Sequence, residues 1–187
     1  MVAQTALIVI DMQKGMRSST LPSRNNPFAE DNIARLAAAW REAKQPLICV
    51  RHVSRSPTSV FAPGQSGIEF QERFVPLPHE HIVEKNVPDA FINTGLERWL
   101  HARGIQQVVV VGVSTNNSVE ATARTAGNLG FMTTVVADAT FTFEKKDYAG
   151  VMRSAEDVHL MALANLHGEY AEVRTTSEVL TTLSVPI

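Results

Sequence analysis

Short apolar runs rich in β-branched residues alternate along this chain with longer segments of helical periodicity. The runs occupy residues 6–10, 46–51, 108–111 and 133–137, with weaker ones at 81–84 and 168–173. Helical periodicity covers residues 28–43, 94–103, 117–129 and 148–166, and a short segment at 177–183. Strands that are apolar along their whole length are typical of a parallel sheet covered by helices on both faces. The pattern therefore predicts an α/β fold of three layers, α/β/α, whose mainly parallel, doubly wound (Rossmann-like) sheet has about six strands.

The length of 187 residues predicts a single domain over residues 1–187. A hydrophobic content of 44% and a formal net charge of −2 favour a globular protein with no nucleic-acid and no membrane partner. The first apolar run ends at Asp11 and is too short for a signal peptide or a membrane span, so we expect a cytoplasmic protein. Cys49 is the only cysteine, and its place in the run LICV predicts a buried, inert thiol.

Residues 54–80 are rich in proline, glycine and serine and are predicted to form a long loop. Loops of this length inside compact domains are uncommon and often serve as lids or binding loops. We expect this lid-like loop to form one wall of an active site. The alternative is a surface excursion that supports an oligomer interface.

Three polar clusters follow predicted strands. Asp11 ends the run ALIVI, Lys85 follows HIVE, and the sequence STNNS follows VVVVG. Ligands of open parallel sheets bind beyond the carboxyl ends of the strands, near the point where the strand order reverses. Taken alone, Asp11 suits a helix cap and Lys85 a solvated surface charge, so the prediction of a site depends on their combination.

The segments LIVIDMQ, EKNVPDAFINTGLERWL, VVVVGVSTNNSVEATARTAGNLGF and VVADATFTF resemble those of isochorismatase-like hydrolases. That family includes nicotinamidases, N-carbamoylsarcosine amidases and isochorismatases. The resemblance runs over residues 5–173 and implies a catalytic triad of aspartate, lysine and cysteine. Asp11 and Lys85 match the first two positions, whereas Ser118 stands where the family has its nucleophilic cysteine.

The serine changes the expected chemistry. A cysteine thiol has a reference pKa of about 8.5, whereas an alcohol is far more basic and normally needs a histidine to activate it. No histidine lies within the motif GVSTNNSV. Ser118 is therefore a weaker nucleophile, a hydrogen-bonding group for substrate or water, or a replacement for a natural cysteine in a trapped enzyme; these three alternatives stay open.

The resemblance also implies a cis peptide bond between Val113 and Ser114 that directs the amides of Ser114 and Ser118 into an oxyanion hole. Such donors suit the start of a helix, where N–H groups lack intrahelical partners. Asp11 is expected to act either as general base in amide hydrolysis or as general acid toward an enol ether. Its pKa would decide, because Lys85 lowers that pKa and burial raises it.

Nicotinamidase-type relatives carry an Asp-x-His-x-x-His metal cluster after the second strand, but here the region reads RHVSRS. His52 stands alone there, so we expect no catalytic metal and no other cofactor. His52 is instead a substrate contact or a satisfied polar residue. The remaining candidates for substrate binding lie near a motif or in the loop, and the aromatic ones among them equally suit core packing: Gln13, Phe61, Phe91, Thr115 and Asn117.

The leading functional hypothesis is hydrolysis of a small amide or carbamoyl-type compound. Its rivals are a vinyl-ether hydrolase of the isochorismatase type, with Asp11 as general acid, and a catalytically silent binding protein. A dinucleotide-binding protein is disfavoured, because the turn DMQKGM lacks the Gly-x-Gly-x-x-Gly fingerprint. The resemblance implies a homo-oligomer, and the apolar helix within residues 147–166 is the expected subunit face.

Overall fold

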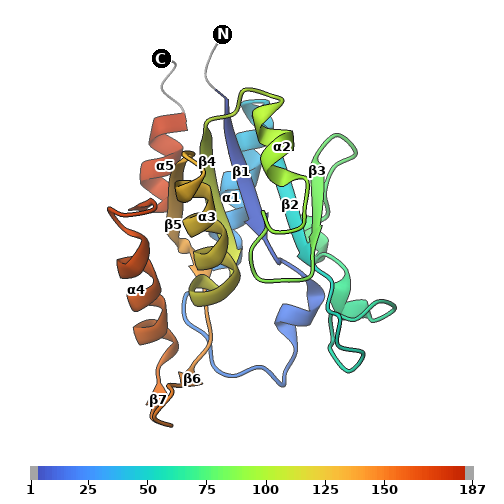
Figure 1. Cartoon of the computed structure of the whole chain (residues 1–187), viewed down its shortest axis with the longest axis vertical. Helices are drawn as coiled ribbons and strands as arrows, with labels where there is room; N and C mark the ends of the chain where they lie inside the picture. Colours follow the sequence, from blue (N-terminus) through green and yellow to red (C-terminus); the bar gives the residue numbers. More distant parts are fainter. Residues whose placement is uncertain (1–3, 184–187) are drawn as a thin grey trace.

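A computed structural model describes residues 4–183. Its centre is a six-stranded sheet in which every pair of neighbouring strands is parallel (Figure 1). In spatial order the strands are β3 (His81–Lys85), β2 (Leu47–His52), β1 (Thr5–Ile10), β4 (Gln107–Val113), β5 (Met132–Phe141) and β8 (Glu172–Arg174). The strand order reverses between β1 and β4, as in doubly wound folds.

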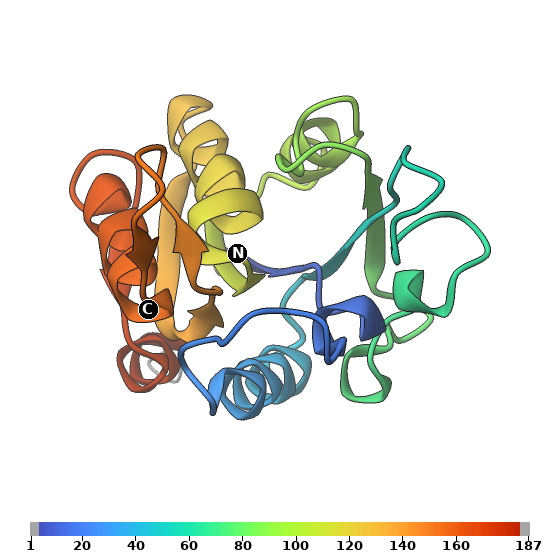
Figure 2. The same ribbon diagram turned by 90° about the horizontal axis from the view of Figure 1, so that it is seen from below.

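Helices cover both faces of this sheet. The core on one face holds residues of α1 (Ala29–Glu42) and α5 (Thr176–Leu183). The core on the other face holds residues of α2 (Leu96–His101), α3 (Glu120–Asn128) and α4 (Ala155–Leu166). Figure 2 shows the resulting three layers from the end of the sheet. The predicted α/β/α fold is therefore confirmed.

The central strands are apolar on both sides because both sides are buried. In β1, Leu7 and Val9 belong to the core under α1, while Ile8 and Ile10 belong to the core under α2 and α3. Cys49 in β2 is buried as predicted, and burial raises the pKa of its thiol to about 12.

Gly112 near the end of β4 allows β4 to run close beside β1. Its φ is +115°, a conformation that L side chains rarely adopt, and a Cβ atom there would lie 2.1 Å from the carbonyl oxygen of Ile10. The strand then continues through Val113 into the segment that carries the site.

The structure corrects two of the predicted helices. The helix expected over residues 148–166 begins at Ala155, because Ser154 caps it by accepting a hydrogen bond from the Asp157 N–H. The residues before it form a two-stranded antiparallel hairpin, β6 (Lys145–Lys146) and β7 (Met152–Arg153). The helix expected over residues 117–129 begins at Glu120 and is preceded by a π-helical turn over Thr115–Val119.

The smaller differences lie at element ends. The helix expected over residues 94–103 is α2, Leu96–His101, and the strand expected over residues 168–173 is β8, which begins only at Glu172.

The loop at residues 54–80 contains two short 3₁₀ helices, Ser66–Ile68 and Glu72–Phe74. It is tied to the chain just after β1, because the Lys14 N–H donates to the Glu69 carbonyl and the Gln71 N–H donates to the Met12 carbonyl. The loop therefore lies beside the carboxyl end of β1, as a wall of a site would. Its action as a lid stays a prediction. No helix within residues 4–183 has the length and apolar character to cross a membrane.

Candidate active site

Asp11, Lys85 and Ser118 come from three distant points of the sequence and meet at the carboxyl edge of the sheet. The Lys85 Nζ lies 2.7 Å from the Asp11 Oδ2 and donates to the Ser118 Oγ at 3.3 Å. The three residues are 1%, 2% and 7% exposed, in the order Asp11, Lys85, Ser118. The spatial convergence expected from the strand ends is therefore present.

Asp11 leaves β1 in a sharp turn. Its φ is +52°, in the left-handed region that aspartate tolerates better than most residues. The Asp11 N–H still donates to the Val50 carbonyl of β2, and the Asp11 carbonyl already accepts from the Gln13 N–H. The carboxylate is thus held by main-chain bonds on both sides of the turn.

Lys85 is the last residue of β3 and stands opposite His52 of β2. It shares the face of the strand with Val83, which belongs to the core under α2 and α3. The side chain of Lys85 is fully buried, so its ammonium group has lost its water and depends on the two acceptors just described.

Ser118 belongs to the π-helical turn Thr115–Val119 between β4 and α3. The Ser114 carbonyl accepts from the Asn117 and Val119 N–H groups, which closes this turn. The peptide bond between Val113 and Ser114 is cis. The use of the Ser114 and Ser118 amides as an oxyanion hole stays a prediction.

Burial dominates the electrostatics of Asp11. It raises the pKa of the carboxyl group above its usual range, and the charge of Lys85 and the hydroxyl of Ser118 oppose that rise without cancelling it. The Asp11 Oδ1 is buried and accepts no hydrogen bond within the described chain. The site thus contains one carboxylate oxygen clamped by Lys85 and a second that is free to take or give a proton.

His52 is half-buried beside this pair. Burial lowers the pKa of its imidazole, and the positive charge of Lys85 lowers it further. Its ring meets Phe61 of the loop edge-on, with ring centroids 6.1 Å apart. Within residues 4–183, no three His, Cys, Asp or Glu side chains are grouped as metal ligands. Contact of His52 or Phe61 with substrate stays a prediction.

Three of the other candidates have partners within the protein, and their contact with substrate stays a prediction. Gln13 is fully buried, and its amide donates to the His52 and Ile68 carbonyls while accepting from the His52 N–H. Phe91 is buried against Phe131, with ring centroids 5.9 Å apart. The Thr115 hydroxyl is bonded to His159, a residue that sequence reasoning missed.

Asn117 is exposed on the π-helical turn, so its side chain lies outside the buried group. Its role in substrate binding stays a prediction.

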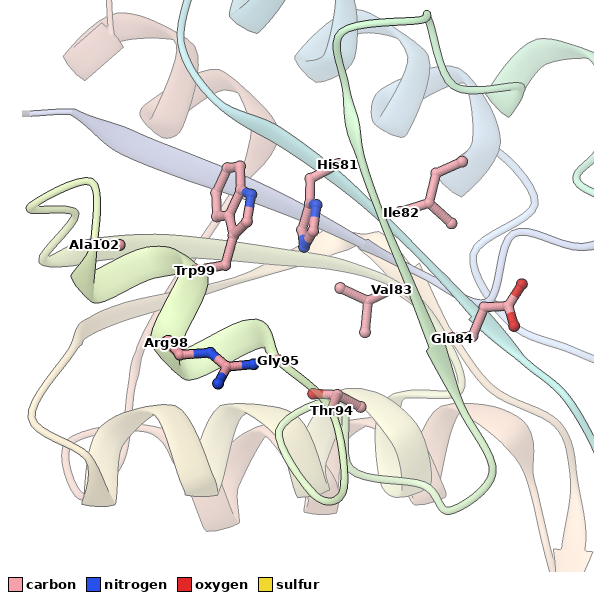
Figure 3. A pocket seen from close by; sticks show the side chains of 9 residues that line it. All are labelled: His81, Ile82, Val83, Glu84, Thr94, Gly95, Arg98, Trp99 and Ala102. Carbon is pink, nitrogen blue, oxygen red and sulfur yellow. The ribbon is translucent and has the colours of Figure 1, made fainter.

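A surface hollow of about 370 Å³ lies elsewhere, along the outer edge of the sheet between β3 and α2 (Figure 3). Trp99 and His81 stack on its wall, with ring centroids 4.4 Å apart. The hollow reaches Val83 and Glu84 but not Lys85. It is therefore separate from the Asp11, Lys85 and Ser118 group.

Comparison with known proteins agrees with this geometry. The family model of the isochorismatase domain matches residues 5–178. An uncharacterised isochorismatase family protein of Bacillus subtilis, YrdC, is 37% identical over 180 residues, which is 96% of either chain. Nicotinamidase 3 of Arabidopsis thaliana is 34% identical over 175 residues, covering 86% of this chain and 79% of that protein.

A crystal structure assigned to the same family, from Chromobacterium violaceum, superposes with a TM-score of 0.94. It has 47% sequence identity and covers 96% of this chain and 93% of its own. Both the sequence relatives and the fold lead to one conclusion. The chain belongs to the isochorismatase family of hydrolases.

Proposed function

We propose that this protein hydrolyses a small amide or carbamoyl-type compound at Asp11, Lys85 and Ser118. The observation that carries the proposal is the buried Lys85 ammonium, which bonds Asp11 at 2.7 Å and Ser118 at 3.3 Å. Lys85 thus holds a nucleophile and a proton acceptor beside one positive charge, and acyl transfer uses these three kinds of group. The relative named nicotinamidase acts on an amide, which supports this class of substrate.

In this mechanism the Ser118 Oγ attacks the carbonyl carbon and its proton passes to Asp11. The tetrahedral intermediate collapses as the C–N bond breaks, and the amine leaves with the proton from Asp11. Water then attacks the acyl-serine ester, again giving its proton to Asp11, and the carboxylic acid is released as that proton returns to the Ser118 oxygen. Water is the only other reactant consumed.

The raised pKa of Asp11 and the charge of Lys85 serve this reaction together. A carboxylate with a raised pKa is a stronger base than an ordinary one, and the free Oδ1 is the atom that receives the proton. The nearby ammonium stabilises negative charge as it develops on the Ser118 oxygen. This pairing replaces the histidine that serine hydrolases commonly use.

Turnover of a panel of small amides and carbamoyl compounds tests the proposal. We expect the Ser118→Ala variant to lose activity by a factor of about 10² or more. We expect Ser118→Cys to keep or raise it, because a thiol ionises far more readily than an alcohol. Intact mass after acid quenching should show an acyl group on Ser118. An active Ser118→Ala variant without any acyl-enzyme would contradict the nucleophilic role.

A second candidate is vinyl-ether hydrolysis, which the raised pKa of Asp11 favours in a different way. A carboxyl group that keeps its proton can donate it to the terminal vinyl carbon and form an oxocarbenium ion. Water adds to this ion, and the resulting hemiketal breaks into an alcohol and a carbonyl compound. Ser118 forms no bond in this route, so Ser118→Ala would keep its turnover of isochorismate while Asp11→Asn would lose it.

The third candidate function that we propose is binding without catalysis, and the same assays test it. In this third case, wild type and Ser118→Cys both fail on every amide and on isochorismate. The site of Asp11, Lys85 and Ser118 then binds a small molecule without transforming it. Heat-stability shifts with the same compounds would then identify the ligand class, because a ligand that binds only the folded state stabilises it.

We also propose that the protein forms a homo-oligomer through the outer face of α4. Leu160 and Met161 are each more than half exposed on this helix. Such neighbouring exposed apolar side chains are typical of an interface. Sedimentation of the wild type beside a Leu160→Glu, Met161→Glu variant tests this, since the charges should dissociate the assembly.

A further inference from the structure

α4 carries one polar side chain on its otherwise apolar buried face. That residue is His159, which is 3% exposed and lies among Ala155, Ala162 and Leu163. Its Nδ1 is 2.8 Å from the Oγ1 of Thr115. Thr115 is the first residue of the π-helical turn that carries Ser118, so the histidine contacts a side chain of that turn.

The two ring nitrogens of His159 have different neighbours. The Asn26 Nδ2 lies 3.4 Å from the His159 Nε2, but its two protons already serve the Ala137 carbonyl at 2.9 Å and the Thr140 carbonyl at 2.6 Å. With the proton on Nε2, Nδ1 is a lone-pair acceptor for the Thr115 hydroxyl.

The neutral ring fixes the direction of the Thr115 hydroxyl. Burial lowers the pKa of His159, which favours the neutral form. With Nδ1 as acceptor, the Thr115 Oγ1 must donate, and its proton points toward α4 and away from Ser118. The side chain of Thr115 is thus a tether between the turn and the helix.

The next residue of the turn is anchored toward the same helix by a chain of hydrogen bonds. The Asn116 Oδ1 accepts from the Thr142 hydroxyl, the Thr142 N–H donates to the Asn25 Oδ1 at 2.9 Å, and the Asn25 Nδ2 donates to Glu156 of α4 at 3.1 Å. Two consecutive residues of the turn are therefore held relative to α4. Of these two links, only the one through Thr115 is direct.

We propose that His159 is a positioning residue, which sets the π-helical turn so that the Ser118 Oγ lies within hydrogen-bond reach of Lys85. The inference rests on the proposed function and extends it to a residue that touches no substrate. A displacement of about 1 Å at a nucleophile costs about 10²-fold in rate, so a tether of this kind affects turnover more than binding. The tether acts through the Nδ1 side of the ring, not the Nε2 side.

Two substitutions of similar size separate the two sides of the ring. The side-chain oxygen of His159→Asn can replace Nδ1 as acceptor for Thr115, whereas the terminal amide of His159→Gln lies at the position of Nε2 and leaves Thr115 without that acceptor. We expect kcat to fall by about 10-fold to 100-fold in His159→Gln, with KM changed less than about 3-fold. His159→Asn should rescue most of that loss at a similar melting temperature.

Thr115 supplies the matching half of a double-mutant cycle. Thr115→Val removes the hydroxyl at nearly constant volume, and Thr115→Ser keeps it. We expect Thr115→Val to lower kcat as His159→Gln does, Thr115→Ser to retain it, and the double variant His159→Gln, Thr115→Val to be no worse than either single one. Equal kcat in His159→Asn and His159→Gln, or independent losses in the double variant, would overturn the proposal.

A readout that needs no turnover separates this inference from the proposed function. In a Ser118→Cys background, the introduced thiol lies beside Lys85, whereas Cys49 is buried and the pKa of its thiol is raised to about 12, so alkylation reports on position 118. The rate at which iodoacetamide alkylates the introduced thiol reports how well the turn holds position 118 beside Lys85. We expect His159→Gln to slow alkylation and His159→Asn to restore it, even if no substrate is found. Identical rates in the two variants overturn the positioning role.

Discussion

Two buried carboxylates of this protein have a basic partner, and their surroundings give them opposite properties. Glu80, just before β3, is clamped by Arg41 of α1, whose Nε and Nη2 donate to its two oxygens at 2.7 and 3.1 Å. The Leu77 N–H adds a third bond at 2.8 Å. Asp11 also has one close basic partner, Lys85, but its Oδ1 accepts no hydrogen bond within the described chain.

This difference in hydrogen bonding decides the proton affinity of each group. Burial by itself would raise the pKa of Glu80, but the hydrogen bonds from Arg41 and from the Leu77 N–H outweigh it, and the pKa is lowered. At Asp11 burial outweighs Lys85, and the pKa is raised. A fully bonded carboxylate is suited to hold two elements together, whereas one with a free oxygen is suited to exchange a proton.

The largest effect that we expect from this contrast is the loss of activity in Asp11→Asn. The amide cannot accept the proton of a nucleophile, so we expect kcat/KM to fall by a factor of about 10² to 10⁴. Glu80→Gln is the matched control, because it makes the same change of carboxylate to amide in the other pair, and its activity should stay within about 2-fold of wild type. Comparable losses in both variants would mean that neither pair is specific to catalysis.

The same two variants should differ in stability. Glu80→Gln weakens three hydrogen bonds to a buried charge, and part of that loss is screened because Arg41 remains about one-third exposed. We therefore expect the free energy of unfolding to fall by about 1–2 kcal/mol, measured by urea denaturation. If Glu80→Gln is as stable as wild type, the Glu80–Arg41 pair is not the structural clamp described above.

A rule of parallel sheets predicted where the site lies, and the family resemblance singled out Asp11, Lys85 and Ser118 within it. Asp11, Lys85 and Ser118 follow strands whose carboxyl ends lie at one edge, so their convergence needs no knowledge of individual contacts. Gln13 follows the same rule, yet its amide binds the main chain of His52 and Ile68. Partners 39 and 55 residues away cannot be read from local periodicity, so these hydrogen bonds of the Gln13 amide were not predicted from the sequence.

The contact of His159 with Thr115 and the β6–β7 hairpin are two features that the sequence analysis did not predict. The contact of His159 with Thr115 joins residues 44 apart, and in the sequence the histidine is one polar position in an apolar helix. The hairpin was predicted as helix, because Tyr148, Val151 and Met152 continue the apolar pattern of α4. The side chain of Asp147 accepts from the Ala149 and Val151 N–H groups and holds a turn there instead.

The pH dependence of stability should have opposite signs for the two carboxylates. The pKa of folded Glu80 lies below its ordinary value of 4.5, so its contribution is complete above pH 4.5 and is lost as the pH falls through the folded pKa. The pKa of folded Asp11 lies above 3.8, so the folded state keeps a proton that the unfolded chain has released, and stability falls as the pH rises from 3.8 through the folded pKa.

Urea denaturation between about pH 3 and 8 measures both effects against non-titrating variants. The advantage of wild type over Glu80→Gln should shrink toward acid pH, while the stability of Asp11→Asn relative to wild type should increase toward neutral pH. We expect each change to be on the order of 1 kcal/mol. When both differences are taken as wild type minus variant, the Glu80 difference should rise with pH and the Asp11 difference should fall, so slopes of the same sign would contradict the contrast between the pairs.

The smallest effect is expected for a pair that is neither buried nor fully bonded. Lys14 and Glu69 lie 2.6 Å apart where the loop at residues 54–80 meets the chain after β1, with side chains 39% and 58% exposed. Water screens such a pair, so Lys14→Met should lower the unfolding free energy less than Glu80→Gln does, and the effect should vanish in about 1 M salt. Because the Lys14 N–H still holds the Glu69 carbonyl, the loop keeps its anchor in this variant. If Lys14→Met lowers the unfolding free energy more than Glu80→Gln does, solvent exposure does not determine how much each ion pair contributes to stability. The loop would then depend on the charge of Lys14.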